Sequence, residues 1–344
     1  MVAEERPARQ EPSDAGSLGV RGRPLPPGEG RGEGSGSLAS RLSSVAGLSV
    51  RPGEPLSRHT TFRIGGPAEL FVEVETEEGL ASLLVAVGEA GAPFFLLGLG
   101  SNVLVPDRGV SGVVARLGKG FKRLAFRKEG VTAGAALALP SVARRTARRG
   151  LSGLEPLCGF PSTVGGAVWM NAGCYGTEIK DVMVAAWLVE PDGTRRRIGV
   201  AELGAGYRST ALQGTGAIVT RASFRLAPAD PTDCVAKIEA LNARRWASLP
   251  YGVGNAGSIF KNPPGDYAGH LIEACGLKGT HRGAAEISAK HANVIVNLGG
   301  ARAEDVLELM LAARRAVSQR FGISLEPEVI LPGELGERWR SSTP

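Results

Sequence analysis

The stretch GLEPLCGFPSTVGGAVWMNAGCYG, residues 153–176, decides the fold of this 344-residue chain more than any other. Glycines and prolines punctuate it throughout, and Ser162 and Thr163 lie between them. A long stretch without secondary structure inside a compact domain is usually functional or disordered. Leu, Phe, Val, Trp and Met are interspersed along it, which argues against disorder. The sequence therefore favours a loop that wraps a large, flat, phosphate-bearing cofactor over an ordinary structural loop.

A second glycine-rich segment, LGLGSNVLV (97–105), follows a predicted strand at 93–98. Its glycines allow backbone N–H groups to approach a phosphate, and Ser101 and Asn102 add hydrogen-bond donors. An ordinary strand–turn–strand is an equally good interpretation of this segment alone. A third segment, GVGNAG (252–257), matches the dinucleotide-binding pattern, but no strand precedes it and prolines follow it. We therefore do not expect it to bind a dinucleotide.

The length of the chain suggests two or three domains. Residues 1–36 are rich in Pro, Gly, Arg, Glu and Ser and predict a disordered tail, with a short helix expected over 38–48. After residue 49 the order of strand-like and helix-like blocks predicts α+β lobes rather than a doubly wound sheet or a TIM barrel. Strands are predicted at 68–74, 93–98, 111–117, 182–198 (two strands with a turn at 191–193), 217–226 and 291–299. Helices are predicted at 76–91 (capped by Thr76), 138–150, 232–246 (capped by Thr232), 265–276 and 303–322, the last with Val306, Leu309, Met310, Ala313 and Val317 facing inward.

The charge balance favours anionic small molecules as ligands. The net charge is +6, and the first fifty residues hold six arginines and six acids, so the excess lies in the folded part. The basic run ARRTARR (143–149) has no interleaved aromatic residues, so we interpret it as a solvated helix face and expect no nucleic acid. The four scattered cysteines form no CxxC pair, which favours a reduced, cytoplasmic location and no metal. No apolar span approaches the ~20 residues of a membrane helix, and the N-terminus does not resemble a signal peptide.

Seven segments occur in the order typical of one family, the UDP-N-acetylenolpyruvoylglucosamine reductases, which the chain resembles from about residue 49 to 333. The segments are TTFRIGGPAELFVEV, LGLGSNVLV, GLEPLCGFPSTVGGAVWMNAGCYGTEIKDV, GYRS, NAGSIFKNP, GLKGTHRGAAEISAKHANVIVN and LEPEV. The resemblance implies an α+β flavoprotein with a two-lobed FAD-binding region of the vanillyl-alcohol oxidase-like (PCMH-type) class and a C-terminal α+β substrate-binding domain. The implied divisions are a tail at 1–48, lobe 1 at 49–118, lobe 2 at 119–228, a substrate-binding domain at 229–335 and a C-terminal tail at 336–344.

The reaction implied by the resemblance is the NADPH-dependent reduction of the enolpyruvyl ether of UDP-N-acetylglucosamine to UDP-N-acetylmuramate, for peptidoglycan. Hydride from NADPH passes through noncovalent FAD to the terminal carbon of the enolpyruvyl double bond. Arg208 of GYRS matches the family's catalytic arginine, which stabilises the developing negative charge. Ser258 of GSIFKNP matches the proton donor. Glu328 of LEPEV matches the third catalytic residue, and it is either protonated or acts through water, because a bare carboxylate would repel the anionic intermediate.

The resemblance also implies contacts with FAD and with the substrate. The implied cofactor-binding residues are Gly98, Gly100, Ser101, Asn102, Val103, Gly159, Pro161, Ser162, Thr163, Gly165, Gly166, Ala167, Asn171 and Gly173. Tyr207, Lys261 and Asn262 are the implied substrate-binding residues, with NADPH using the same face in turn. Structural turn residues are the alternative for Lys261 and Asn262.

Three residues depart from the family's usual pattern. Leu99 and Ser162 stand where glycine is common, and Ile330 stands where a basic residue often follows PEV. Ser162 must therefore avoid a backbone angle open only to glycine, or tolerate strain. The interval between GYRS and NAGSIFKNP has no room for the substrate-capping insert of one subtype, so the chain resembles the shorter subtype.

Two alternatives stay open on the sequence. One is a related FAD-dependent oxidase or dehydrogenase acting on alcohols or hydroxy acids. Many of those enzymes attach flavin through a histidine in the glycine loop, and none of the four histidines (59, 270, 281 and 291) lies there. The other is a non-catalytic nucleotide-sugar binding protein, against which the retention of Arg208, Ser258 and Glu328 argues.

Overall fold

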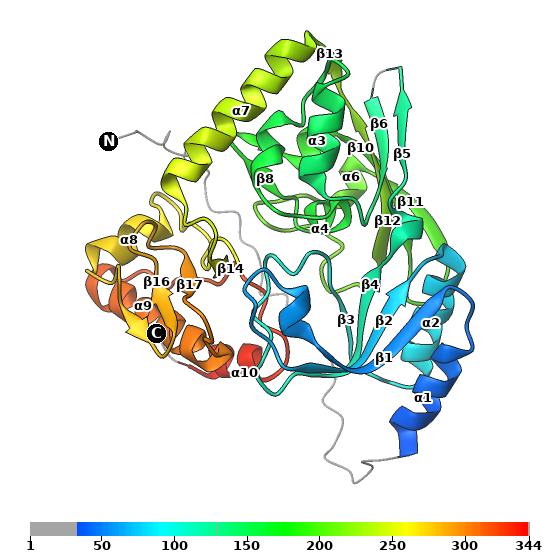
Figure 1. Ribbon diagram of the computed structural model, residues 1–344, viewed down its shortest axis with the longest axis horizontal. Helices are drawn as coiled ribbons and strands as arrows, with labels where there is room; N and C mark the ends of the chain where they lie inside the picture. The colour runs from blue at the N-terminus through cyan, green and yellow to red at the C-terminus, as the bar shows by residue number, and fades with distance from the viewer. Residues whose placement is uncertain (1–32, 129, 343–344) are drawn as a thin grey trace.

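The computed structural model describes residues 33–128 and 130–342, which form three sheets of four or five strands with their helices (Figure 1). Two further sheets have two strands each: β7 (Leu151–Ser152) with β13 (Ala227–Pro228), and β8 (Gly173–Cys174) with β9 (Thr177–Glu178). Most of the tail predicted at 1–48 lies outside the described residues. The part that is described contains helix α1 (Glu33–Ser43), which overlaps the short helix expected over 38–48 but begins and ends five residues earlier. Leu38 and Leu42 are spaced to share one helical face, and both are buried in the main hydrophobic core. That burial stabilises α1 against the rest of lobe 1.

Lobe 1 is built on a four-stranded sheet with the strand order β1-β2-β4-β3. Strand β1 is antiparallel to β2, whereas β2, β4 and β3 run parallel to one another. The helix that connects β2 to β3 begins where predicted, since the Thr76 hydroxyl accepts a hydrogen bond from the Gly79 N–H. The elements are β1 (Leu48–Pro55), β2 (Pro67–Val74), α2 (Glu77–Glu89), β3 (Phe94–Leu96) and β4 (Val110–Leu117).

Lobe 2 contains a five-stranded antiparallel sheet with the order β11-β10-β12-β6-β5. The predicted strand pair joined by a turn at 191–193 is present as β10 and β11. The stretch 153–176 is not a structureless loop, because it contains a 3₁₀ turn (Glu155–Gly159) and the short helix α4, which Thr163 caps. The elements are β5 (Leu124–Arg127), β6 (Gly130–Gly134), α3 (Leu139–Ala147), α4 (Val164–Trp169), β8 (Gly173–Cys174), β9 (Thr177–Glu178), α5 (Ile179–Val182), β10 (Met183–Val189), β11 (Arg195–Gly199), α6 (Val200–Leu203) and β12 (Ile218–Arg225).

Helix α7 (Pro231–Ser248) leads from lobe 2 to the C-terminal domain (Figure 1). Its cap is Asp230 rather than the predicted Thr232, because the Asp230 carboxylate accepts the N–H groups of Thr232 and Asp233, and Pro231 takes the first helical position. The domain has a sheet of order β14-β17-β16-β15. Its elements are β14 (Gly254–Asn255), α8 (Ala268–Ala274), β15 (His281–Arg282), β16 (Ala285–Ile287), β17 (Ile295–Asn297), α9 (Ala303–Phe321) and α10 (Glu334–Ser341).

Helix α9 buries the apolar face that its sequence predicts, and all five of the inward residues are at most 1% exposed. Lobe 1 caps this helix, since the Asp107 carboxylate accepts the N–H groups of Ala303 and Glu304. Phe62 of lobe 1 also lies in the hydrophobic core of the C-terminal domain. These contacts fix the C-terminal domain against lobe 1. Among the helices of the described residues, none is long and apolar enough to cross a membrane.

The predicted C-terminal tail, 336–344, is a helix over most of its length. Helix α10 packs Trp339, which is 8% exposed, near Phe260, with ring centroids 5.9 Å apart. The Arg314 guanidinium lies over the Trp339 ring at 4.6 Å and donates hydrogen bonds to the carbonyls of Trp339 and Ser342. The eight-residue helix is too short to be stable alone, so this tertiary packing is what orders it.

We expect Trp339→Ala to lower the free energy of unfolding by about 3–5 kcal/mol, as is usual for the truncation of a buried aromatic residue. Denaturant unfolding of the holoprotein measures the change. Trp246 is the matched control, because it is 52% exposed and its replacement by alanine should cost less than ~0.5 kcal/mol. A loss below ~0.5 kcal/mol for Trp339→Ala as well would mean that the packing of α10 does not contribute to the stability of the domain.

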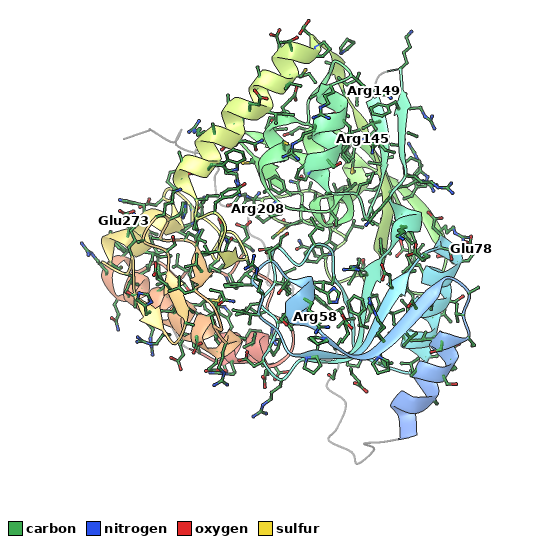
Figure 2. The ribbon with its side chains drawn as sticks, in the orientation of Figure 1. Arg58, Glu78, Arg145, Arg149, Arg208 and Glu273 are labelled. Carbon is green, nitrogen blue, oxygen red and sulfur yellow. The ribbon has the colours of Figure 1, made fainter. Side chains whose placement is uncertain are left out.

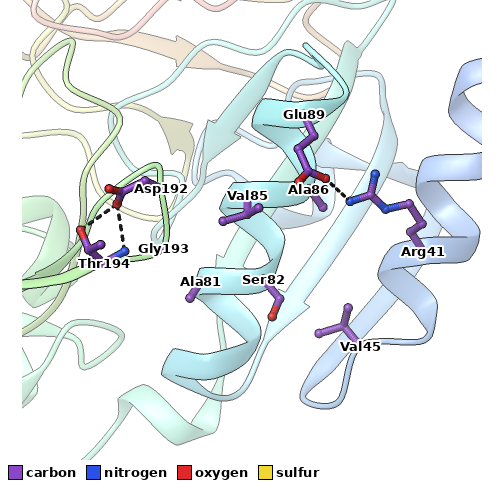
Figure 3. Close-up of a pocket in the computed structure, with 10 residues that line it drawn as sticks. All are labelled: Arg41, Val45, Ala81, Ser82, Val85, Ala86, Glu89, Asp192, Gly193 and Thr194. Atoms are coloured by element: carbon purple, nitrogen blue, oxygen red, sulfur yellow. Dashed lines mark hydrogen bonds and ion pairs between the residues drawn. The ribbon is translucent and has the colours of Figure 1, made fainter.

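A surface pocket of about 530 Å³ lies between α1, α2 and the turn at Asp192–Thr194 (Figure 3). The Arg41 guanidinium and the Glu89 carboxylate form an ion pair at 2.5 Å across its rim. The residues that line it are Arg41, Val45, Ala81, Ser82, Val85, Ala86, Glu89, Asp192, Gly193 and Thr194. None of them belongs to the predicted functional site, so this pocket is separate from that site.

Candidate active site

Arg208 lies where lobe 2 faces the C-terminal domain (Figure 2). Its Nε is 2.8 Å from Oε1 of Glu328, although the two residues are 120 positions apart. Their side chains are only 19% and 14% exposed, so water screens the ion pair weakly. Burial lowers the pKa of Arg208, but the Glu328 carboxylate, together with Tyr207 and Cys174, outweighs this effect and holds that pKa above its usual value. The arginine is therefore a permanent cation at this position.

Ser258 is brought close to Glu328 by backbone pairing between their two segments. The Glu328 N–H donates to the Ile259 carbonyl at 2.8 Å, and the Lys261 N–H donates to the Glu326 carbonyl at 2.9 Å. Ser258 immediately precedes Ile259 and is half-buried. Among the described residues, none forms a hydrogen bond with the Ser258 hydroxyl. The structure thus brings the three predicted catalytic residues into one region and leaves this hydroxyl available to a ligand.

Two of the predicted substrate-binding residues lie against each other next to Arg208. The Arg208 guanidinium is 5.1 Å from the centre of the Tyr207 ring, a cation–π contact. The Tyr207 hydroxyl accepts a hydrogen bond from the Asn262 N–H at 3.4 Å, and burial raises the pKa of this hydroxyl. Lys261 immediately precedes Asn262, and its Nζ forms an ion pair with Oε2 of Glu326 at 3.3 Å. All three residues therefore lie on the two segments that carry Arg208 and Ser258.

The two glycine-rich loops meet each other across lobes 1 and 2. The Ser101 hydroxyl donates a hydrogen bond to the Pro161 carbonyl. A Cβ at Gly98 would come within 2.9 Å of the Thr163 hydroxyl, so a larger residue there would displace the Thr163 side chain. Within the described chain, the backbone N–H groups of 98–102 have no protein acceptor. Such a run of free N–H groups is suited to bind phosphate oxygens.

The side chains of several predicted cofactor residues contact protein. Val103 and Ala167 are buried in hydrophobic clusters. Asn171 is fully buried, and its amide donates to Glu178 and to the Gly206 carbonyl while its oxygen accepts from the Lys180 N–H. Every hydrogen-bonding site of the Asn171 side-chain NH₂ group is occupied, so that side chain differs from its predicted role. Cofactor contacts through the backbone of these residues stay a prediction.

Three predicted cofactor glycines are explained by close packing of the protein on itself. A Cβ at Gly100 would lie 2.1 Å from the His59 carbonyl oxygen, and one at Gly173 would lie 2.7 Å from Cγ of Glu178. A Cβ at Gly165 would lie 3.0 Å from the Cβ of Ala135. These glycines therefore allow protein segments to approach each other closely. From the sequence alone, a glycine needed for such packing cannot be distinguished from a glycine that makes room for a ligand.

The three departures from the family pattern cause no visible strain. Within the described residues, the non-glycine positions with positive φ are Arg63, Asn171, Tyr175 and Arg208, so neither Leu99 nor Ser162 adopts a glycine-only angle. Leu99 is 40% exposed beside the free N–H groups. Ile330 pairs with Val103, and its carbonyl accepts the Leu104 N–H. Its apolar side chain thus packs near the small core of lobe 1.

The backbone of His59 lies against Gly100 of the first glycine-rich loop, but the imidazole ring of His59 contacts other residues. The ring stacks on Phe71 at 4.5 Å, its Nε2 is 2.8 Å from Glu54 and its Nδ1 is 3.0 Å from Arg116. With both nitrogens engaged, this ring is not placed to form a bond with a flavin.

Sequence reasoning missed the contacts that connect the parts of the site. The Asn102 side chain donates to the Glu328 carbonyl at 3.0 Å and so joins the first glycine loop to the catalytic segment. Thr210 and Gln213 donate to the carbonyl of Trp169 at the end of α4. No motif marks these contacts, since they join segments that are far apart in the chain.

Comparison with known proteins agrees with this arrangement. A model of an FAD-binding domain matches residues 68–199, and a model of the C-terminal domain of UDP-N-acetylenolpyruvoylglucosamine reductase matches residues 249–331. UDP-N-acetylenolpyruvoylglucosamine reductase 2 of Symbiobacterium thermophilum is 48% identical over 298 residues, covering 86% of this chain and 97% of the relative. The reductase of Rubrobacter xylanophilus is 45% identical, covering 82% of this chain and 94% of the relative.

A solved structure extends the similarity to the fold. The crystal structure of UDP-N-acetylenolpyruvylglucosamine reductase from Thermus caldophilus superposes with a TM-score of 0.70 at 39% identity, covering 83% of this chain and 98% of that one. The predicted fold class, a two-lobed FAD-binding region followed by a C-terminal α+β domain, is confirmed. By its sequence, its domains and its fold, this chain belongs to the UDP-N-acetylenolpyruvoylglucosamine reductase family.

Proposed function

We propose that this protein reduces UDP-N-acetylglucosamine enolpyruvate to UDP-N-acetylmuramate with NADPH and FAD, in the synthesis of peptidoglycan precursors. The observation that carries the proposal is the meeting of Arg208, Glu328 and the Ser258 segment in a chain of this family. An oxidase or a binding protein of the same fold would not need that combination. We place the reaction in the cytoplasm with small molecules as its partners, which the four free cysteines support.

The residues of the two glycine-rich loops fit FAD. The free N–H groups of 98–102 are suited to the diphosphate. The second glycine-rich loop lies on the other side of the proposed FAD site and contributes Gly159, Pro161, Ser162 and Thr163. The hydrogen bond from Ser101 to the Pro161 carbonyl joins the two loops. Bound FAD supplies the hydride transfer between NADPH and the enolpyruvyl double bond.

Arg208 and Ser258 have complementary roles in the proposed reaction. When hydride reaches the terminal carbon, negative charge develops on the neighbouring carbon and on the substrate carboxylate. The half-buried Arg208 guanidinium stabilises that charge in surroundings where water screens it weakly. The Ser258 hydroxyl then gives its proton to the neighbouring carbon, which completes the reduction. Serine is a weak acid, so this step requires a strongly basic carbon close to the hydroxyl.

Glu328 and the substrate-binding residues hold this arrangement in place. The ion pair neutralises the charge of Glu328 and fixes the Arg208 guanidinium, which removes the repulsion that a bare carboxylate would cause. Tyr207, Lys261 and Asn262 are assigned to the substrate, with the Lys261 ammonium close to its diphosphate. A positive charge next to a diphosphate is the usual arrangement in sites that bind nucleotide sugars.

The rate of NADPH consumption with and without the enolpyruvyl substrate tests the proposed function. We expect substrate to stimulate consumption by at least two orders of magnitude, with UDP-N-acetylmuramate as the product. UDP-N-acetylglucosamine, which lacks the enolpyruvyl group, is the matched control and should give no stimulation. Equal and negligible rates in all three assays would favour the binding protein, whereas consumption of a hydroxy acid with oxygen would favour the oxidase.

A further inference from the structure

The backbone of Arg208 adopts a conformation that arginine rarely occupies. Its φ is +54°, in the left-handed region that favours glycine. The turn that contains it is closed by two hydrogen bonds between Gly206 and Ser209, one of which is long at 3.4 Å. These two hydrogen bonds do not by themselves stabilise a left-handed arginine. Contacts between the turn and other segments must therefore hold Arg208 in this conformation.

Those contacts come from the end of helix α4. The Asn171 amide donates to the Gly206 carbonyl at 2.9 Å, just before Arg208. The Thr210 hydroxyl donates to the Trp169 carbonyl at 2.7 Å, just after Arg208. Gln213 donates to the carbonyls of both Trp169 and Arg208, at 3.4 and 3.2 Å. Both ends of the turn are thus fastened to residues 169–171.

The position of the Asn171 side chain is itself fixed, because this side chain is fully buried and its amide is fully hydrogen-bonded. Its second amide hydrogen is donated to Glu178 at 2.9 Å, and its oxygen accepts the Lys180 N–H at 3.0 Å. Helix α4 is capped at its other end by Thr163, which lies in the second glycine-rich loop. A single short helix therefore connects that loop to the turn of Arg208.

We propose that Asn171 and Thr210 are positioning residues that hold the Arg208 guanidinium in its reactive place. This inference rests on the proposed function, in which Arg208 stabilises the developing negative charge. Neither side chain is assigned to substrate, and both act through the backbone on either side of residue 208. A displacement of about 1 Å at a catalytic group can cost on the order of a hundredfold in rate. The loss of either contact should therefore slow only the step in which Arg208 acts.

Thr210→Val is the sharpest test, because valine keeps the shape of threonine and removes only the donated hydrogen bond. We expect the reoxidation of the reduced holoenzyme by substrate to slow about 10- to 100-fold, while its reduction by NADPH changes less than about twofold. Thr210→Ser restores the hydroxyl and should recover most of the rate. Thr215→Val is the control, since the Thr215 hydroxyl donates to the Leu212 carbonyl and accepts the Ala217 N–H but does not touch the turn.

A double-mutant cycle separates positioning from a general loss of structure. In an Arg208→Gln background, Thr210→Val should slow reoxidation no more than about twofold further, because the residue through which it acts is gone. The same fold-loss in both backgrounds, or equal slowing of both half-reactions, would overturn the inference. If Thr210→Val does not fold, as judged by bound FAD and thermal midpoint, Gln213→Leu at a half-buried position takes its place in the cycle.

The proposed function and this inference can fail separately. If the unmodified protein shows no substrate-dependent reoxidation, the proposed function is wrong. A crystal structure of Thr210→Val then decides the inference, which predicts that residue 208 leaves the left-handed region or that its ion pair with Glu328 lengthens. An unchanged turn and an unchanged 2.8 Å ion pair would reject it.

Discussion

Replacing Ser258 by alanine should slow the reoxidation of the reduced holoenzyme by substrate about a thousandfold. General acid catalysis contributes ~10²–10⁴-fold to a rate, and the hydroxyl of Ser258 is free of protein partners among the described residues. Reduction by NADPH requires no proton from this hydroxyl and should stay within about twofold. Stopped-flow absorbance of the flavin, with each substrate added separately, measures the two half-reactions.

Ser248→Ala is the matched control, since Ser248 lies in the preceding segment, is exposed and donates only to the carbonyls of α7. It should leave both half-reactions unchanged. Equal slowing of the two half-reactions in Ser258→Ala would point to a distorted site. A normal rate of reoxidation would show that the proton comes from another group.

The second large effect is expected at Arg208. Arg208→Gln removes the cation that faces the developing charge, and we expect reoxidation by substrate to slow about 10²–10³-fold, as is usual when one stabilising donor is lost from an active site. It also leaves the Glu328 carboxylate, which is 14% exposed, without its partner, so the variant should be less stable.

The double variant Arg208→Gln/Glu328→Gln separates these two effects. It removes the unpaired charge and should recover stability in a thermal melt, while its rate of reoxidation stays low. Arg282→Gln is the control for the loss of an ion pair, because Arg282 and its partner Glu308 are each about half exposed, at 51%. Recovery of the rate in the double variant would mean that Arg208 serves only to neutralise Glu328.

The local elements of the fold follow from the sequence because neighbouring residues determine them. The cap at Thr76 and the buried face of α9 both depend on spacings within one helix, and both are present. The order of motifs also identified the family, since the glycine-rich loops and the Arg208, Ser258 and Glu328 segments occur in the order typical of it. The chemistry available at each of these positions is fixed by residue type alone.

The sequence is least informative for residues whose surroundings come from distant segments. Residues 336–344 look like a polar tail, and only the packing of Trp339 near Phe260 and Arg314 makes a helix stable there. Asn171 stands in a glycine-rich stretch that predicts contact with FAD, and its side chain is bound to Glu178, Lys180 and the Arg208 turn, so only its backbone is left for the predicted contact. Pattern and spacing cannot distinguish a polar residue that binds a ligand from one that binds the protein.

The sequence by itself determined which residues could carry out the reduction and in what kind of flavoprotein they lie. Only the tertiary structure decided that Arg208 pairs with Glu328 and that Asn102 joins the first glycine loop to it. These contacts span 120 and 226 positions of the chain. The physical reason is that a side chain's local conformation depends on its neighbours in sequence, whereas its partners depend on how separate lobes pack together.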